Sequence, residues 1–555
     1  MSGAHLEKES PLGVVIGGSL SDGLEVLLAP GESVQLGQFT KVEVEGGGTL
    51  LGMVTDIGSE AVDSDIPVED LSNPLLDNVV QDKAVHTTFR LDLHLELFAG
   101  GEEPAPACSM PGHFSSVLHA DQVTVGRAFA TSGPSISVGI PLGLEKLEVA
   151  VDLERLFERS AAIFGKSGTG KSVLVLHLLN ALLTRSSAAP TNSERTVALV
   201  FDRHNDYGQG VRQVPSLKQL HQTDVELFTL ESLPSSSDGQ VLIGTHDIQP
   251  RDLQTLGDSL SLSDLSIEAA YACSERFGHG WIDEIVAEEP SGVLLSKLWP
   301  LDPPAADVNW SQVAARMGFS ESFESLRRSM NWLTRRKFIR GGGSHLGDVA
   351  ERIVRSLQGG KSVVVQFGAF EDDHICYMLV ANMLSRRIWE RYRFSTQHSQ
   401  KFLGLNNLVI VLEEAHKLLG RSSSGQSILG QIASEMRKYN VTLLVIDQWP
   451  SRIEPEVLSQ IGTKFCLQLD SDNEVEALVG SGTGCSGLHR VIGSIGRRRQ
   501  AVAFGHALPM PLVIQTPEAP NSQSDEKSFR ARLGLSEREE ISPAKALFGA
   551  PGSSD

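Results

Sequence analysis

The first part of the chain alternates between apolar and polar positions at a period of two. Residues 89–97 alternate at every step, and shorter segments typical of strands recur between turn residues at 13–16, 24–28 and 49–54. A period of two places one face of a strand against a core and the other face in solvent, as in a small barrel. We therefore predict an all-β barrel over residues 1–150.

Beyond residue 150 the pattern changes to short, continuous apolar runs separated by longer segments of helical character. The apolar runs lie at 161–164, 197–201, 362–367, 408–412 and 442–446. Strands that are apolar on both faces are typical of a parallel sheet covered by helices on both sides. The pattern predicts an α/β fold with a doubly wound, mainly parallel sheet.

Two further stretches interrupt this α/β pattern. Residues 215–245 are polar and read as loops, and residues 250–345 read mostly as helices. We expect five segments in all, namely an N-terminal β-barrel (1–150), the first part of the core (151–245), an inserted helical subdomain (246–345), the second part of the core (346–516) and a flexible C-terminal tail (517–555).

Composition limits the class of protein. The 555 residues carry a net charge of −21, which argues against nucleic-acid binding as a bulk property, although a few basic residues could gather at one surface. The five cysteines are scattered singly, which argues against a disulfide framework and a structural zinc site. The sequence contains no membrane-spanning run and no signal peptide, so we expect a cytoplasmic protein without a membrane partner.

A phosphate-binding loop follows the apolar run 161–164. The pattern G-x-x-x-x-G-K-[ST] is matched in full by Gly165, Lys166, Ser167, Gly168, Thr169, Gly170, Lys171 and Ser172. A helical run begins directly after it, and this strand–loop–helix context gives the motif its meaning. The backbone N–H groups can surround phosphate oxygens, Lys171 can bridge the outer phosphates, and the Ser172 hydroxyl can bind Mg²⁺. The sequence therefore predicts an ATP and Mg²⁺ site here, and the alternative is a plain glycine-rich turn.

Two carboxylates stand at the end of the run 408–412. An enzyme that hydrolyses a nucleotide bound at such a loop needs one carboxylate near Mg²⁺ and a second one that polarises the attacking water. Glu413 fits the metal role and Glu414 the catalytic role, because ligands of open α/β sheets bind at the carboxyl ends of the strands. The alternative is a pair of acidic residues that begins a helix.

The next apolar run, 442–446, ends in Asp447-Gln448-Trp449-Pro450. A polar side chain leaving a neighbouring strand can reach the γ-phosphate or its water, so Gln448 is a candidate sensor. An ordinary turn ended by Pro450 is the alternative.

The order of these motifs resembles the HerA-like branch of the HerA/FtsK superfamily of ring ATPases. Three more segments carry the resemblance, namely 201–207 (F-D-R-H-N-D-Y, similar to the family's D-P-H-G-E-Y), 413–416 (E-E-A-H) and 437–453, which holds R-K-Y-N-V and Q-W-P-S-R-I. The sequence departs from the family at Arg203, Asn205, Asp206 and Trp449, where the family has Pro, Gly, Glu and often Arg.

The resemblance implies a RecA-like P-loop ATPase core and a homo-hexameric ring that translocates double-stranded DNA, often with a separate nuclease of the NurA type. It also implies that Arg159 and Arg437 supply positive charge at the subunit boundary, where such a cation stabilises phosphoryl transfer. An ordinary surface salt bridge is the alternative for each arginine.

A second function stays open. The ring could instead be an ATP-gated scaffold that regulates a bound effector enzyme, as in an antiviral defence complex. An ATPase of protein export or conjugation shares this core, but the N-terminal barrel argues against it. The run 497–499 (R-R-R) could contact phosphate or cap a subunit contact, and the loop 420–426 could face a pore or solvent.

Overall fold

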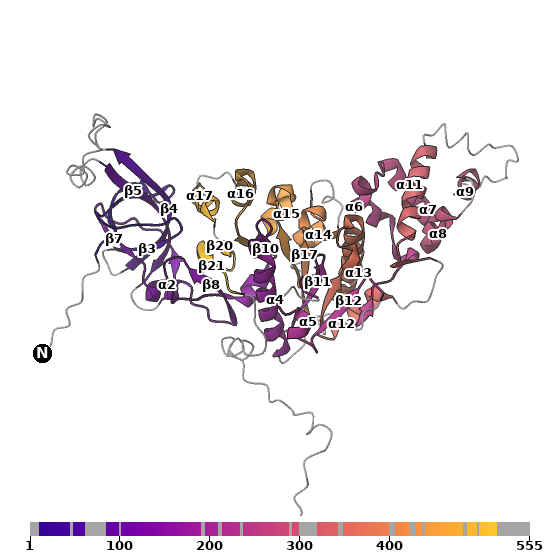
Figure 1. Cartoon of the computed structure of the whole chain (residues 1–555), viewed down its shortest axis with the longest axis horizontal. Coiled ribbons are helices and arrows are strands. Elements are labelled where there is room, and N and C mark those ends of the chain that lie inside the picture. Colours follow the sequence, from indigo (N-terminus) through magenta and orange to yellow (C-terminus); the bar gives the residue numbers. More distant parts are fainter. Residues whose placement is uncertain are drawn as a thin grey trace, which may run out of the picture.

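The computed structural model holds a β-barrel at one end, an α/β core in the middle and a group of helices at the other end (Figure 1). It describes residues 10–44, 48–61, 85–98, 102–189, 195–208, 214–232, 237–287, 291–298, 319–341, 348–398, 406–420, 428–435, 439–480, 486–496 and 499–518. Apart from its first two residues, the expected C-terminal tail lies outside these ranges.

Six strands form the barrel, as the alternating pattern predicted. They are β1 (Gly13–Ser19), β2 (Gly23–Leu28), β3 (Phe39–Val44), β4 (Gly48–Ala61), β5 (Val85–Leu97) and β7 (Ser116–His119). The barrel closes because β2 pairs with β1 on one side and with β5 on the other. Its interior is apolar, with Val26, Val42, Leu50 and Leu91 fully buried.

A twelve-stranded sheet forms the core, in the order β13-β12-β16-β11-β17-β18-β10-β19-β20-β21-β8-β9. Its strands are β8 (Ser135–Pro141), β9 (Val149–Asp152), β10 (Ala161–Phe164), β11 (Thr196–Asp202), β12 (Val225–Thr229), β13 (Gly239–Gln240), β16 (Ser362–Gln366), β17 (Asn407–Glu413), β18 (Val441–Asp447), β19 (Thr463–Cys466), β20 (Gln500–Gly505) and β21 (Leu512–Gln515). Neighbours from β13 to β19 are parallel, and those from β19 to β9 are antiparallel. The predicted α/β fold with a mainly parallel sheet is confirmed.

Helices cover both faces of this sheet. Right-handed crossovers place α4 (Lys171–Ser187) and α5 (Leu217–Leu220) on one face. The opposite face carries α12 (Val349–Gln358), α13 (His374–His398), α14 (Ile428–Glu435) and α15 (Pro455–Gln460). Residues Leu174 to Leu183 of α4 are buried, so the helix that follows the glycine-rich loop is held firmly in the core.

Two features of the core differ from the sequence-based expectation. The stretch 215–245, read as loops, contains the buried strand β12, because Val225, Leu227 and Phe228 pack into the core although Glu226 interrupts the run. The strand β8 pairs with β21 of the large sheet, so chain before residue 150 already contributes to the core. The five segment boundaries themselves stay predictions.

The helical group lies between β13 and β16 in the sequence, as predicted. It contains α6 (Pro250–Leu260), α7 (Asp264–Phe277), α8 (Trp281–Val286), α9 (Ser291–Leu298) and α11 (Phe319–Thr334). A buried ion pair joins it to α13, because Arg386 donates through Nε and Nη2 to the Asp252 carboxylate at 2.9 and 2.8 Å.

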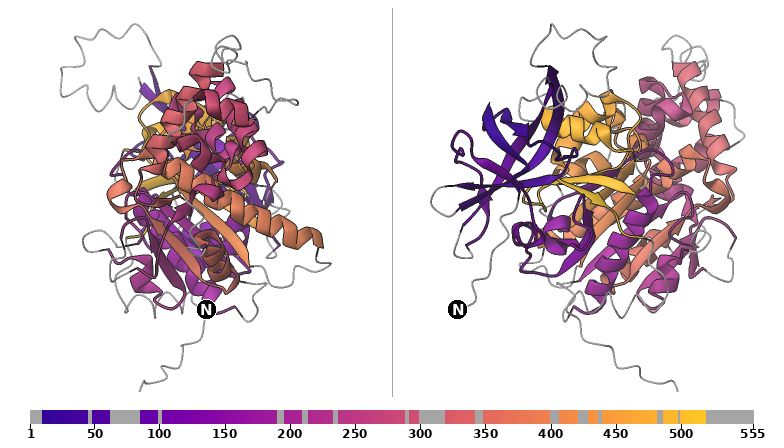
Figure 2. Two further views of the ribbon diagram at one scale, coloured as in Figure 1. Left: turned by 90° about the vertical axis from the view of Figure 1, so that its right-hand side faces the viewer. Right: turned by 60° about the vertical axis from the view of Figure 1, so that its left-hand side comes forward.

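The barrel contacts the core through α17 (Ser486–Ser494), which lies beside β4 (Figure 2). Arg490 Nε donates to the backbone oxygen of Thr55 at 3.0 Å and lies 3.3 Å from the Asp56 carboxylate. In the part of the chain that the structure describes, no helix is long and apolar enough to cross a membrane.

Candidate active site at the carboxyl edge of the sheet

The glycine-rich loop joins β10 to α4 in backbone conformations that glycine favours. Gly165, Gly168 and Gly170 have φ values of 154°, 78° and 112°. The first of them also touches its neighbours, since a Cβ on Gly165 would lie 2.8 Å from Cβ of Leu467. The loop is thus fixed by geometry that other residues would strain.

Lys171 begins α4 and turns back over the loop. Its Nζ donates to the backbone oxygens of Gly165 at 2.6 Å and Lys166 at 2.9 Å. Burial lowers the pKa of Lys171, and the negative charges of Asp447 and Glu413 oppose that shift. The ammonium group therefore lies between the loop and a group of carboxylates, where outer phosphates of a nucleotide would meet it.

Glu413 ends β17 and is almost fully buried, with 4% of the residue exposed. Its Oε2 accepts hydrogen bonds from the backbone N–H groups of Arg203 at 2.8 Å and His204 at 3.2 Å. Burial raises its pKa from the ordinary 4.5 to about 7. This carboxyl group thus exchanges its proton near neutral pH and would give it up to a divalent cation.

Glu414 follows directly and has left-handed backbone angles, with φ 44° and ψ 48°. Its carboxylate forms ion pairs with Arg203, with Lys417 at 2.7 Å and with His204 at 3.5 Å. The hydrogen bond from His204 and these cations hold the pKa of Glu414 well below its usual range. Glu414 is therefore charged at neutral pH and available to polarise water, but it is tied to three neighbours.

The segment after β11 is shaped by Asp202, a residue that the motif contains but that the sequence did not single out. The fully buried Asp202 carboxylate accepts hydrogen bonds from the backbone N–H groups of Asp206 at 2.8 Å, Tyr207 at 3.1 Å and Gly208 at 2.7 Å. These bonds fold the chain back at the end of β11. As a result, the N–H groups of Arg203 and His204 point at Glu413.

Asp447 has a similar organising role at the end of β18. Its carboxylate accepts hydrogen bonds from the backbone N–H groups of His416 at 2.6 Å, Gln448 at 2.6 Å and Trp449 at 2.9 Å. The His416 ring lies 3.0 Å from the same carboxylate and edge-on to the Trp449 ring. Gln448 thus begins the turn after β18, and its neighbour Asp447 pairs with Phe164 at the end of β10. Its role as a sensor stays a prediction.

Magnesium fits the donors present. Ser172 lies in the first turn of α4 beside the buried Tyr207 phenol, and Glu413 ends a strand two places away in the sheet. Among the described residues, no group of three or more His, Cys, Asp or Glu side chains could hold a metal alone. Mg²⁺ keeps several waters and binds chiefly through nucleotide phosphates plus one or two protein oxygens. Ser172 and Glu413 are the residues that would hold it.

Arg159 does not belong to this edge. Arg159 is exposed and precedes β10, whereas the glycine-rich loop follows β10, so the two lie at opposite ends of one strand. It packs against Gly462, whose notional Cβ would lie 2.8 Å from Cβ of Arg159. Arg437 lies outside the described residues.

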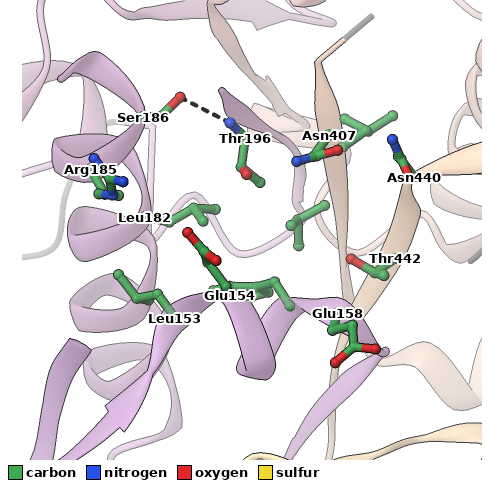
Figure 3. Close-up of a pocket in the computed structure, with 13 residues that line it drawn as sticks. Leu153, Glu154, Glu158, Leu182, Arg185, Ser186, Thr196, Asn407, Asn440 and Thr442 are labelled. Carbon is green, nitrogen blue, oxygen red and sulfur yellow. Dashed lines mark hydrogen bonds between the residues drawn. The ribbon is translucent and has the colours of Figure 1, made fainter. Parts of the chain in front are cut away.

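A pocket of about 530 Å³ opens at that opposite, amino-terminal edge. Figure 3 shows the Glu154 carboxylate within it and the side chains of Asn407 and Asn440 across from it. These asparagines begin β17 and precede β18, far from the ends of the same strands that carry Glu413 and Asp447. This pocket is therefore distinct from the nucleotide site.

Comparison with known proteins places this arrangement in context. Residues 136–388 match the family described as helicase HerA, central domain. The DNA double-strand break repair helicase HerA of Pyrococcus furiosus is 21% identical over 546 residues, which cover 91% of this chain and 92% of the relative. The protein of the same name from Saccharolobus solfataricus is 22% identical over 561 residues, which cover 97% and 99% of the two chains.

Solved structures of the plasmid coupling protein TrwB are also similar. One complex with a non-hydrolysable ATP analogue has a TM-score of 0.48 at 10% identity, covering 73% of this chain and 94% of that chain. A complex of TrwB with ADP and Mg²⁺ has a TM-score of 0.46 at 12% identity, with the same shares covered.

Proposed function

Because this chain belongs to the HerA-like ATPases, we propose that it forms a hexameric ring and translocates double-stranded DNA at the expense of ATP. A separate nuclease of the NurA type acts with it in DNA processing or repair. The observation that carries this proposal is the match, over nine-tenths or more of both chains, to relatives that are DNA double-strand break repair helicases.

In this proposal each residue of the site has a separate role in ATP hydrolysis. Lys171 and Ser172 hold the phosphates and Mg²⁺ together with Glu413, Glu414 polarises the attacking water, and Gln448 senses the γ-phosphate. The proximity of Glu413 and Glu414 to Lys171 supports this division, since both carboxylates act on the charge of Lys171.

Arg159 completes the site of a neighbouring subunit. Its position across β10 from the loop supports this role, because in a ring the carboxyl edge of one sheet can face the amino edge of the next. Arg437, which precedes β18, would act at the same boundary. A cation supplied in trans would couple hydrolysis in adjacent subunits.

Mixed rings test the role of Arg159. Lys171→Ala and Arg159→Ala proteins should each be inactive alone. Mixed in equal amounts, they should recover activity, because about a quarter of the boundaries would then join an intact Lys171 to an intact Arg159. Mixtures as inactive as the single variants would exclude action in trans.

The translocase itself is tested by steady-state ATP hydrolysis with and without linear double-stranded DNA, at low and moderate salt. We expect strong stimulation that weakens with salt, because contacts to phosphates release counterions. The Glu414→Gln protein is the control and should show no stimulated turnover.

The net charge of −21 supports a second candidate function, because a negative charge weakens the general attraction of a protein to DNA. In this second function the ring is an ATP-gated scaffold for a bound effector enzyme. Hydrolysis that is indifferent to DNA, together with an effector that copurifies in stoichiometric amounts, would favour it.

A further inference from the structure

Arg499 lies directly against the glycine-rich loop, although it precedes β20 at the far end of the sequence. Its backbone N–H donates to the oxygen of Thr169 at 2.9 Å. Its own carbonyl oxygen accepts from the backbone N–H of Thr516 at 2.8 Å and from the Thr516 hydroxyl at 3.0 Å. Arg499 is therefore hydrogen-bonded to the glycine-rich loop on one side and to Thr516, which directly follows β21, on the other.

The backbone of Arg499 adopts a conformation that side chains disfavour. Its φ is 63°, in the left-handed region that glycine tolerates best. Such a conformation persists only where the surrounding contacts impose it, and it is found most often at functional sites. Here the three hydrogen bonds made by the N–H and carbonyl groups of Arg499 hold this conformation.

The side chain lies over the N-terminus of α4. A Cβ on Gly170 would lie 3.0 Å from Cγ of Arg499, so the last glycine of the loop leaves room for the arginine stem. The N-terminus of α4 and the loop N–H groups are where phosphate oxygens bind. The aliphatic part of the Arg499 side chain thus lies next to the loop that is expected to bind phosphate.

The guanidinium group is paired with a carboxylate that is easily displaced. Its Nη2 lies 2.9 Å from the Glu518 carboxylate, and the Glu518 side chain is 82% exposed. Exposed ion pairs contribute little to stability, so a better partner can replace Glu518 at small cost. A phosphate is such a partner, because guanidinium binds it through two parallel hydrogen bonds.

From these contacts we propose that Arg499 is a second cation of the nucleotide site, which binds a phosphate oxygen of ATP and leaves Glu518 when nucleotide enters. Glu518 is then a competitor that occupies the arginine while the site is free of nucleotide. The proposal rests on the ATPase part of the proposed function and is independent of DNA translocation.

Binding of a fluorescent ATP analogue to the full chain, without DNA, tests the proposal. Arg499→Ala should weaken binding about tenfold or more, the effect of losing one charge-assisted hydrogen bond. Arg499→Lys, which keeps the charge, should weaken it less. Glu518→Gln should tighten binding severalfold, because the competing charge is gone.

Lys361→Ala is the matched control. Lys361 forms an exposed ion pair with Glu226 at 2.6 Å and stands at the start of β16, at the other edge of the sheet. The Lys361→Ala protein should bind the ATP analogue as tightly as the unmodified chain does. Thermal unfolding of each variant checks that the fold is retained.

Two results would overturn the proposal. One is an Arg499→Ala protein that is folded and binds ATP as tightly as the unmodified chain. The other is a Glu518→Gln protein whose affinity is unchanged or weaker. Hydrolysis that ignores DNA would instead contradict the translocase and leave this proposal intact, so the two can fail separately.

Discussion

Arg203 forms an ion pair with Glu414, the residue we assign as catalytic base. The two are 211 positions apart and meet because β11 and β17 are parallel neighbours that end at one edge. The D-P-H-G-E-Y pattern that the segment 201–207 resembles has proline where this chain has Arg203. A cation on the base stabilises its charged form and makes it a weaker acceptor of protons.

Removing this cation should therefore speed hydrolysis. In Arg203→Ala the pKa of Glu414 rises toward its usual range, and a base whose pKa lies closer to the working pH is more effective. We expect turnover at pH 8 to rise severalfold, with ATP affinity little changed. The double variant Arg203→Ala/Glu414→Gln should show no gain, and a fall in turnover in the single variant would contradict the assignment.

Glu414→Gln should bind ATP but lose turnover. Losing a positioned general base costs about 10²- to 10⁴-fold in rate, whereas the loop that binds phosphates is untouched. Steady-state hydrolysis and analogue binding, measured on one preparation, separate the two effects. Glu456→Gln, in the first turn of α15, is the matched control and should behave as the unmodified chain. Normal turnover of the Glu414→Gln protein would show that Glu414 is not the catalytic base.

Mg²⁺-dependent nucleotide binding should strengthen between pH 6 and pH 8. The pKa of Glu413 is about 7 because the group is buried, so it is mostly protonated at pH 6 and mostly charged at pH 8. Only the charged form binds a cation well, and binding below pH 7 should release a proton. Titration calorimetry in two buffers of different ionisation enthalpy measures both quantities.

Two variants identify the group responsible. Glu413→Gln should bind Mg²⁺ and ATP weakly and without this pH dependence. His204 also has a raised pKa, because it donates to Glu414, but His204→Gln should keep the pH dependence. Equal affinities at pH 6 and pH 8 in the unmodified chain would show that Glu413 does not hold the metal.

The fold could be predicted from the sequence where a pattern is local. Alternation identified β5, and continuous apolar runs identified β10, β11, β16, β17 and β18. The strand β12 escaped because Glu226 breaks its apolar run. Its place in the sheet depends on pairing with β16, more than 130 positions away, which no local pattern reports.

In the candidate site, too, the sequence predicted the residues with a local pattern and missed those whose role depends on distant contacts. The glycine-rich loop, Glu413 and Glu414 carry local signals that place them at strand ends. The roles of Asp202 and Asp447 come from which backbone N–H groups turn toward them, and that is decided by the loops beyond the strands. For Arg499 the sequence left two roles open, and contact with Thr169 and Gly170 favours phosphate.

The buried pair of Arg386 and Asp252 should be essential for holding the helical group on the core. Both side chains are at most 1% exposed, and Arg386 also donates to the backbone oxygen of Asp247 at 3.0 Å. Arg386→Met leaves the Asp252 charge buried without its partner, which should cost about 3–5 kcal/mol in the free energy of unfolding. Adding Asp252→Asn removes the charge but keeps an oxygen for the backbone N–H of Gln249, which Asp252 caps at 2.8 Å. The double variant should therefore recover much of the loss in urea unfolding. If the single variant is as stable as the unmodified chain, the pair does not hold the helices in place.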